Sequence, residues 1–303
     1  MPEVKTHDGS VLEAEVLGSG PALLLPVSPK PAEGPQAEEM RKWGMDPALG
    51  RTLMDGLSDA FRVVAFDYEG HVMAHPKPGT LTPANVAADF LAVADAVGAE
   101  RFAYYGYSWL ALSGLQLAIR TDRLSALAMG GFPPLGGPYA EMLRVTEATH
   151  ELSLAGAAGQ GGEQGQAQGE AQNEAQGEAR GENSGEKGGD EFDWSAVEVT
   201  MSPDQTRQFL TLYRALDGFD DASVQAGLTC PRLCFAGSAD EIPYGERWGG
   251  VHVSIGGPVM RRRAELESLG WTVRVLDGMD HTQAMQPPNV LPVLRPWLES
   301  VLL

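Results

Sequence analysis

The sequence has few cysteines and no long apolar run. Its two cysteines, Cys230 and Cys234, are too few for a disulfide framework and have no partners at metal-ligand spacing. We therefore expect two reduced, structural thiols, no metal site and no cofactor. No apolar stretch reaches the roughly eighteen residues of a membrane span, and the first residues lack the pattern of a secretory signal. The expected location is the cytoplasm, with no membrane association.

Positive charge is also scarce. The chain has 22 Lys and Arg against 41 Asp and Glu, a formal net charge of −19 at pH 7, and its longest basic cluster is Arg261-Arg262-Arg263. Such a chain would repel a phosphate backbone, which argues against nucleic acid as a partner. The expected partner is a small-molecule substrate, and the composition leaves the oligomeric state open.

Large apolar side chains are missing from one internal segment, residues 156–190. Without them, the segment has nothing to bury against the entropy lost on ordering. Its centre repeats a four-residue pattern, such as Ala171-Gln-Asn-Glu174, which on a helix would stack like charges at i, i+4. We expect a disordered acidic insert, either a tolerated surface loop or a tether for a partner.

Apolar runs bounded by Gly, Pro or Asp alternate with helical patterns on both sides of this segment. Buried strands are expected at 22–27, 62–66, 102–105, 126–129, 232–236 and 272–276. Helices are expected at 47–60, 82–97, 109–121, 258–269 and 289–302. The alternation predicts an α/β fold with a mostly parallel central sheet and helices on both faces. Before it, residues 3–6 and 11–17 flank Asp8-Gly9 and predict a hairpin that opens the sheet.

Two amphipathic helical patterns lie in the middle of the chain, at about 138–154 and 203–216. The second begins with Ser202-Pro203-Asp204-Gln205, in which serine caps, proline fits the first turn and glutamine completes a capping box. We expect these helices to form a cap, residues 136–225, that contains the insert at about 156–190. Residues 1–135 and 226–303 would then form the two parts of the core.

A serine stands where an apolar strand is expected to run into an apolar helix, in Gly106-Tyr107-Ser108-Trp109-Leu110. At such a turn the serine Oγ is lifted above the sheet, and the helix N-terminus offers N–H groups to an oxyanion. The tight turn favours small residues two before and two after the serine. Gly106 satisfies the first requirement, and Leu110 departs from the second.

These residues, and the order of elements around them, resemble the α/β-hydrolase superfamily over nearly the whole chain outside 135–225. The resemblance implies a nucleophile at Ser108, an acid after a later strand and a histidine before the last helix. Asp240 ends a Gly-x-x-Asp motif after a strand, and His281 follows the last strand. His281 would take the proton from Ser108, and Asp240 would orient the imidazole. The rival carboxylates are Glu241, Asp277 and Asp280.

A second family feature is Phe66-Asp67-Tyr68-Glu69-Gly70-His71, which resembles an Asp-x-Arg-Gly-x-Gly loop with Glu69 in the place of arginine. His71 and His75 are four residues apart, which could suggest a metal pair. Gly70 and Pro76 argue against a helix there, so we expect a loop with incidental histidines.

The oxyanion site departs from the family pattern as well. The usual His-Gly after the third strand is replaced by a proline-rich stretch, residues 25–31. One donor is expected to be the backbone N–H of Trp109. Because Pro26 and Pro29 have no N–H, the second donor is expected to be Val27 or Ser28.

The resemblance implies hydrolysis of an ester, thioester or lactone of a small, largely apolar substrate through an acyl-serine intermediate. The residues expected to line the pocket are Met142, Leu143, Phe209 and Tyr213. Carbon–carbon bond hydrolysis, acyl transfer and cofactor-free peroxidation use a similar triad and remain alternatives. A non-catalytic binding protein, or an interaction protein recruited through the insert, also remains open. Epoxide and haloalkane hydrolases fit less well, because they place aspartate where Ser108 stands.

Overall fold

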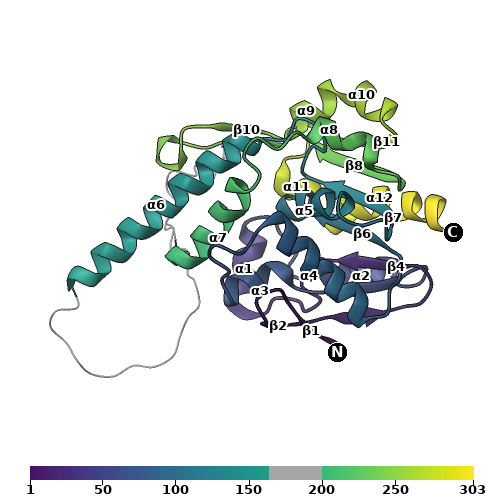
Figure 1. Cartoon of the computed structure of the whole chain (residues 1–303), viewed down its shortest axis with the longest axis horizontal. Coiled ribbons are helices and arrows are strands. Elements are labelled where there is room, and N and C mark those ends of the chain that lie inside the picture. Colours follow the sequence, from purple (N-terminus) through teal and green to yellow (C-terminus); the bar gives the residue numbers. More distant parts are fainter. Residues whose placement is uncertain (164–199) are drawn as a thin grey trace.

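A seven-stranded sheet forms the centre of the molecule (Figure 1). The computed structural model describes residues 1–163 and 200–303, and the strand order is β11-β8-β7-β6-β4-β5-β3. The strands are β3 (Glu15–Leu17), β4 (Ala22–Leu25), β5 (Arg62–Ala65), β6 (Phe102–Tyr107), β7 (Leu124–Gly130), β8 (Arg232–Gly237) and β11 (Trp271–Leu276). All neighbours pair in parallel except β3 with β5. The predicted mostly parallel sheet is confirmed.

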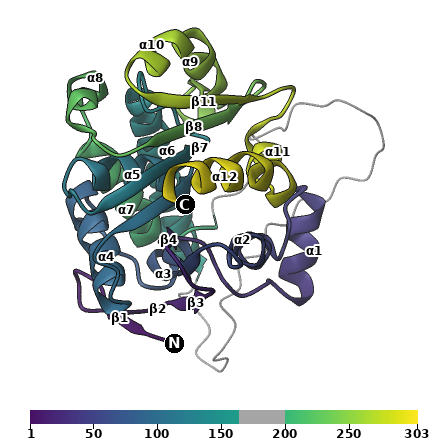
Figure 2. The same ribbon diagram turned by 90° about the vertical axis from the view of Figure 1, so that its right-hand side faces the viewer.

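Helices cover both faces of this sheet (Figure 2). They are α4 (Pro83–Ala96) and α5 (Trp109–Ala118) on one face, and α2 (Leu49–Leu57) and α12 (Pro287–Leu302) on the other. Successive residues of a strand point to opposite faces, so Leu24 joins the apolar cluster with α4 and α5, whereas Leu23 and Leu25 join the one with α2 and α12. Burial on both faces explains why the strands are continuous apolar runs.

The N-terminal hairpin forms as predicted but does not open the central sheet. β1 (Glu3–Lys5) and β2 (Val11–Glu13) pair antiparallel as a separate two-stranded sheet, and only β3 joins the central one. The ammonium of Lys77, whose side chain is fully buried, donates to Asp8 Oδ2 at 2.6 Å and to Ser10 Oγ at 2.9 Å. These polar contacts hold the hairpin against the core without pairing it to the central sheet. The prediction that the hairpin opens this sheet is therefore wrong.

Two helices from the middle of the chain pack on each other beyond one edge of the sheet (Figure 1). They are α6 (Tyr139–Glu163) and α7 (Pro203–Arg214), and α7 begins with the predicted capping box at Ser202. The prediction of a disordered insert from residue 156 is wrong for residues 156–163, which continue α6. Extending an existing helix is less costly than starting one, so helix runs on into the small residues beyond Leu154. The remainder of the predicted insert, 164–190, lies outside the described residues.

The remaining α-helices and β-strands of the described residues are short, and two 3-10 helices, Gln225–Gly227 and Glu246–Trp248, accompany them. The short α-helices and β-strands are α1 (Gly34–Lys42), α3 (Tyr68–Ala74), α8 (Asp221–Val224), β9 (Glu241–Pro243), β10 (His252–Ser254), α9 (Gly256–Arg261), α10 (Arg263–Ser268) and α11 (His281–Ala284). The predicted helix at 258–269 is thus divided in two at Arg262, whose ψ is 14°. None of the described helices is long and apolar enough to cross a membrane.

The expected loop around His71 is wrong, because residues 68–74 form α3. Asp67 caps this helix, since its Oδ1 accepts a hydrogen bond from the N–H of Gly70 at 2.8 Å. Pro76 lies beyond the end of the helix and does not interrupt it. A favourable N-cap therefore outweighs the low helix propensity of glycine here.

Candidate active site

The turn between β6 and α5 holds Ser108 in a conformation that residues other than glycine rarely adopt. Its φ is 56° and its ψ is −129°, and no other non-glycine residue in the described ranges has a positive φ. Such a backbone costs about 1–3 kcal/mol and persists only where the surrounding structure enforces it. This conformation is typical of a sharp strand-to-helix turn that exposes a nucleophile.

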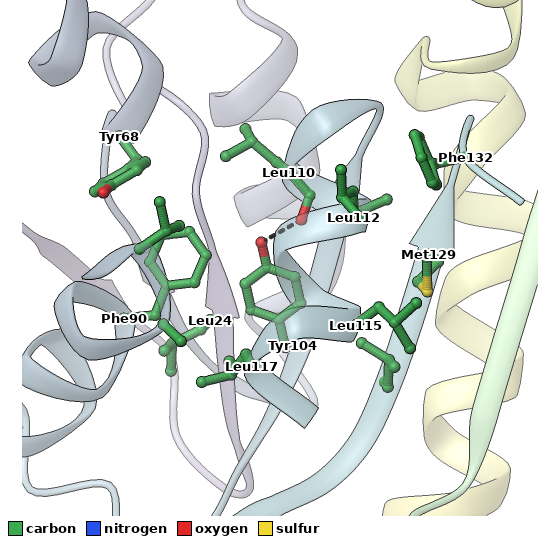
Figure 3. Packing of buried hydrophobic residues seen from close by; sticks show 14 of the residues in the cluster. Leu24, Tyr68, Phe90, Tyr104, Leu110, Leu112, Leu115, Leu117, Met129 and Phe132 are labelled. Atoms are coloured by element: carbon green, nitrogen blue, oxygen red, sulfur yellow. Dashed lines mark hydrogen bonds between the residues drawn. The ribbon is translucent and has the colours of Figure 1, made fainter. Parts of the chain in front are cut away.

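Gly106 makes that turn possible. A Cβ at Gly106 would lie 2.4 Å from the carbonyl oxygen of Leu110, so the first turn of α5 already occupies the space of a side chain. The hydroxyl of Tyr104 donates to the same Leu110 oxygen at 2.7 Å (Figure 3). The Leu110 side chain, 6% exposed, packs in the apolar cluster with Leu112 and Leu115. The core therefore accommodates the larger residue two positions after the serine.

Asp240 and His281 come together after two neighbouring strands, β8 and β11. The Nδ1 of His281 lies 2.9 Å from Oδ2 and 3.1 Å from Oδ1 of Asp240, whose side chain is fully buried. Burial raises the pKa of the Asp240 carboxyl, and the hydrogen bond with His281 partly offsets this rise. With Nδ1 bonded to the carboxylate, the Nε2 of His281 is the nitrogen left for chemistry.

The rival carboxylates are engaged elsewhere. Glu241 accepts from the hydroxyl of Ser254 at 2.7 Å and lies 2.6 Å from His252 Nε2. Asp280 caps α11 by accepting from the N–H of Gln283 at 2.8 Å. Asp277 is exposed, 3.4 Å from Ser238 Oγ. Of the four candidate acids, Asp240 is the one in contact with His281.

A close backbone approach at Gly237 aligns these two loops. A Cβ at Gly237 would lie 2.0 Å from the carbonyl oxygen of Met279, which precedes His281 by two residues. The N–H of Ala239 donates to that same oxygen at 3.0 Å, and the N–H of Ser238 donates to the carbonyl oxygen of Leu276 at 2.9 Å. The segment that carries Asp240 and the segment that carries His281 are therefore joined by their backbones.

Tyr107 connects the serine turn to the histidine, a role that the sequence pattern did not reveal. Its hydroxyl donates to the carbonyl oxygen of His281 at 2.8 Å, and the two ring centroids are 5.0 Å apart. Because Tyr107 directly precedes Ser108, the imidazole lies close to the serine turn. Ser108 Oγ and His281 Nε2 form no hydrogen bond in the described part of the chain. Catalytic hydrogen bonds in unliganded enzymes are often long and tighten when substrate binds.

The candidate oxyanion donors differ in whether their N–H groups are free. The N–H of Val27 donates to the carbonyl oxygen of Leu25 at 2.9 Å and is therefore engaged. The backbone N–H groups of Ser28 and Trp109 have no hydrogen-bond partner within residues 1–163 and 200–303. Trp109 starts α5, where N–H groups lack partners within the helix.

The candidate pocket residues differ in burial: Met142, Leu143 and Phe209 are half-buried, whereas Tyr213 is buried. Phe209 on α7 lies edge-on to Trp109, with ring centroids 5.4 Å apart, so α7 contacts the residue that follows Ser108. Met142 and Leu143 on α6 are half-buried and pack against the apolar cluster that contains Leu112 and Leu115. Tyr213 is only 3% exposed, and burial raises the pKa of its hydroxyl, so its position is that of a packing residue.

Metal-ligating side chains do not gather in the part of the chain that the structure describes, where no group of three His, Cys, Asp or Glu could hold a metal ion. His71 instead contacts the hairpin, with Nε2 3.0 Å from Ser10 Oγ. Cys230 and Cys234 are free thiols, and burial raises the pKa of Cys234 to about 12. A thiol with this pKa is protonated near neutrality and unreactive.

No protein-family model matches the chain, and no curated protein matches its sequence. Solved structures are similar over nearly its whole length. A thermophilic esterase from Thermogutta terrifontis has a TM-score of 0.58 at 15% identity, over 99% of this chain and 98% of that one. The enol-lactonase from Burkholderia xenovorans has a TM-score of 0.56 at 17% identity, over 98% and 100%. A protein that recognises and cleaves the ring of the Pseudomonas quinolone signal has a TM-score of 0.59 at 13% identity, over 99% and 100%.

These likenesses establish the architecture. The chain has the α/β-hydrolase fold, as the motif around Ser108 and the order of strands and helices predicted. Fold alone does not define an activity, because one scaffold hosts many chemistries. The activity has to be argued from the residues at the sheet edge.

Proposed function

We propose that the protein is a serine hydrolase, a carboxylic ester hydrolase that cleaves an ester, thioester or lactone through an acyl-serine intermediate at Ser108. The observation that carries the proposal is the strained backbone of Ser108, φ 56°, at the N-terminus of α5. Residues with strained backbones of this kind cluster at active sites. The contact between Asp240 and His281 at the same sheet edge supplies the base that such a serine needs.

The proposed reaction uses the side chains in the following order. His281 Nε2 takes the proton as Ser108 Oγ attacks the carbonyl carbon, while Nδ1–H stays bonded to Asp240, whose charge stabilises the imidazolium. His281 then gives this proton to the leaving oxygen or sulfur, and the acyl group remains on Ser108. Water, deprotonated by His281, attacks the acyl-serine and releases the acid. Ser108 recovers its proton from His281.

For the oxyanion, we propose the backbone N–H groups of Trp109 and Ser28. Both are free in the described structure, whereas the N–H of Val27 is bonded to Leu25. Donors that are already in place stabilise the developing charge without reorganisation, and each is worth about a hundredfold to a thousandfold in rate. Ser28 thereby replaces the donor that the usual His-Gly segment supplies.

For the substrate, we propose a small and largely apolar acyl or alcohol group bound between α5 and the cap. Trp109 and Phe209 are in contact edge-to-face, and Met142 and Leu143 on α6 pack against the same large apolar cluster as these two rings. A mostly apolar lining with few polar groups is typical of small-molecule sites. The similar structures include an esterase and an enol-lactonase, and these two names are in keeping with the proposed substrate class.

A fluorophosphonate probe tests the nucleophile directly. We expect the wild-type protein to be labelled and Ser108→Ala to be unlabelled. Ser113→Ala is the matched control, because Ser113 lies on the same helix but is buried and donates to the Trp109 carbonyl at 2.9 Å. This control should label like the wild type. An unlabelled wild type would instead favour a binding protein that keeps the hydrolase scaffold.

A panel of short- and medium-chain esters, thioesters and lactones then identifies the bond that is cleaved. We expect hydrolysis that Ser108→Ala abolishes and Ser113→Ala preserves. Labelling without hydrolysis of any of these substrates would reject this substrate class and leave acyl transfer or carbon–carbon cleavage to be tested on the same serine.

A further inference from the structure

A pocket of about 720 Å³ opens at the edge of the sheet opposite to the proposed active site. Its lining comes from the end of α5, the start of β7 and the segment between α8 and β8, so we name it the Arg120 pocket after the arginine at the end of α5. Strands β7 and β8 begin at this edge, whereas Ser108, Asp240 and His281 follow strand ends at the other. In Figure 2, α8 lies at the opposite side of the molecule from α11, which begins at His281. The Arg120 pocket is therefore separate from the proposed triad.

Part of this lining is apolar and is fixed by the core. Leu124 and Leu228 line the Arg120 pocket and are only 4% and 5% exposed. Ile119, also in the lining, packs against the same apolar cluster. Small-molecule sites of this volume are mostly apolar, with a few polar groups that orient the ligand. The apolar part of the lining therefore suits the carbon skeleton of a small molecule.

The polar part of the lining carries positive charge. Arg120 lines the pocket, and its Nη1 donates to the backbone oxygen and to the Oε1 of Gln116, both at 2.8 Å. These bonds engage one of the three guanidinium nitrogens and hold the side chain in place. Partial burial lowers the pKa of Arg120, as expected for a cation placed against protein without an opposite charge.

Two further arginines stand beside the lining. Arg101 donates from Nη2 to the carbonyl oxygen of Leu124 and from Nη1 to that of Asp122, both at 3.4 Å. Arg232 donates from Nη1 to the carbonyl oxygen of Leu228. Since all three of these acceptors belong to lining residues, the two guanidinium groups lie next to the Arg120 pocket.

These cations are not neutralised by carboxylates. Within the described residues, Arg101, Arg120 and Arg232 form no ion pair, and their hydrogen bonds all go to carbonyl oxygens. Two buried donors beside them, Gln116 Nε2 and Arg232 Nε, have no hydrogen-bond partner in the same part of the chain. Asp122 is the one acidic residue that the described structure places in the lining, and it is exposed. The Arg120 pocket thus combines an apolar surface with an excess of charged donors.

This combination is the chemistry that recognises an organic anion. Guanidinium groups bind carboxylates through short, charge-assisted hydrogen bonds, and an apolar lining holds the carbon skeleton. The net charge of −19 opposes the approach of an anion from afar. At physiological ionic strength, however, screening limits this opposition to about 8 Å, so the nearby arginines decide the sign of the local potential.

We propose that the Arg120 pocket is a second binding site, which takes a small carboxylate with an apolar body, such as an aryl-substituted alkanoate. Arg120 binds the carboxylate group, and Leu124 and Leu228 contact the apolar body. The proposal goes beyond the proposed hydrolase function, because no residue of the triad belongs to this site.

Cys230 provides a measurement specific to this pocket. It is a half-buried residue of the lining, and burial raises the pKa of its thiol, with Arg232 and Arg101 acting against this rise. The only other cysteine, Cys234, is buried with a pKa of about 12, so alkylation of the native protein by N-ethylmaleimide at about pH 8–9 reports on Cys230. We expect 4-phenylbutyrate to protect Cys230 with a Kd about tenfold lower than that of the uncharged 4-phenylbutyramide, the size of one charge-assisted hydrogen bond.

Substitutions of opposite charge should shift this Kd in opposite directions. Arg120→Gln should raise the Kd of 4-phenylbutyrate about tenfold, and Asp122→Asn should lower it by about two- to threefold, as for an exposed charge. Arg274→Gln is the matched control, because Arg274 is exposed, donates to the Val273 carbonyl oxygen at 3.1 Å and lies outside the lining. It should leave the Kd unchanged. Calorimetric titration gives the same Kd values without the thiol, so altered reactivity of Cys230 in a variant does not affect the comparison.

Three results would overturn the proposal. They are a saturating concentration of 4-phenylbutyrate that leaves Cys230 unprotected, equal Kd values for the acid and the amide, and equal Kd values for wild type and Arg120→Gln. Ser108→Ala should bind 4-phenylbutyrate as the wild type does. Failure of the fluorophosphonate experiment would therefore reject the hydrolase function and leave this second site standing.

Discussion

Asp240 serves the proposed chemistry at the expense of stability. Its carboxyl is fully buried and its pKa is raised, first by desolvation, despite the contact with His281 at 2.9 Å. A raised pKa in the folded state means that the native protein holds this proton more tightly than the unfolded chain. The contribution of Asp240 to stability is therefore greatest at low pH and is lost as the pH rises through its native pKa.

Asp240→Asn should accordingly lower activity without lowering stability. We expect kcat on a reactive ester to fall by about 10⁴-fold, because the amide no longer enforces the required tautomer of His281. The midpoint of thermal unfolding should be equal to or higher than that of wild type near pH 7. The difference in unfolding midpoint between variant and wild type should grow as the pH rises above about 4, because this is the ordinary pKa of an aspartate in the unfolded chain.

Calorimetry over this pH range, combined with ester kinetics, measures both effects. Asp277→Asn is the matched control, since Asp277 is exposed and does not contact His281. It should change neither activity nor the unfolding midpoint. A midpoint for Asp240→Asn well below that of wild type at pH 7 would contradict this account of the buried carboxyl.

Tyr107 is expected to act as a positioning residue for His281. Tyr107→Phe removes the hydroxyl that donates to the His281 carbonyl oxygen and leaves the ring contact in place. We expect kcat to fall by about tenfold with KM little changed, as for a misplaced catalytic group. Tyr105→Phe, on the same strand and just as aromatic, serves as control and should retain full kcat. Equal kcat values for the two variants would reject the positioning role.

At the scale of residues, the sequence was informative where chemistry restricts the choice of side chain. Only certain residue types serve as nucleophile and base, so motif and chain order lead to Ser108, Asp240 and His281 as the candidates. The structure brings the last two into contact. The oxyanion donor could not be predicted in this way. The choice between Val27 and Ser28 depends on which backbone N–H is already bonded, and a sequence carries no such information.

Among the elements, the close approach of β8 to the segment before α11 is the one on which the proposed site depends most. Gly237→Ala should drive the new methyl group into the Met279 carbonyl oxygen, 2.0 Å away, and push the His281 segment from Asp240. We expect kcat to fall by at least about a hundredfold, since small displacements of a catalytic group have effects of this size. Gly227→Ala, where a Cβ would meet nothing within 4 Å, should be silent in both kinetics and thermal unfolding.

The hairpin β1–β2 is held by a buried ion pair. Burial acts to raise the pKa of Asp8, but the hydrogen bonds from Lys77, Ser10 and Thr6 outweigh it and hold this pKa well below its usual range. Native Asp8 thus stays ionised to lower pH than in the unfolded chain. Its stabilising contribution is present above about pH 4 and is lost as the pH falls further.

Lys77→Met keeps most of the apolar stem but leaves the charge of Asp8 without its partner. We expect a loss of about 3 kcal/mol, the lower end for a broken buried pair because the Asp8 side chain is 29% exposed. Thermal unfolding should shift down by about 6–12 °C near pH 7. The double variant with Asp8→Asn should recover part of this loss, and a double variant no more stable than Lys77→Met alone would show that the ion pair is not the cause.

The elements that the sequence predicted well are those whose pattern is set by burial. The parallel strands agree with the apolar runs to within two residues at each end, because covered faces admit few other side chains. The helix α3 and the hairpin of β9 and β10 were not predicted. The first depends on a single cap at Asp67, and the second on pairing between short strands, neither of which leaves a periodic signal.

For the whole molecule, the composition of residues 164–190 predicts a segment that contributes little to the stability of the rest. Deleting the repeats at 167–182 shortens the connection between α6 and α7, and halving such a connection changes the free energy of unfolding by only about 0.6 kcal/mol. We expect the unfolding midpoint to move by no more than about 2 °C and the activity on a simple ester to be unchanged. A large loss of thermal stability would show that these repeats pack against the fold.

The order of the strands in the sheet has a consequence for the making of the protein. Ser108, Asp240 and His281 leave the ribosome in that sequence, and His281 reaches Asp240 only when the edge strand β11 has paired with β8. A nascent chain therefore carries the proposed nucleophile for most of translation without its base. If Ser108 acts as proposed, hydrolysis can begin only once the last strand has joined the sheet, and incomplete chains should be inactive.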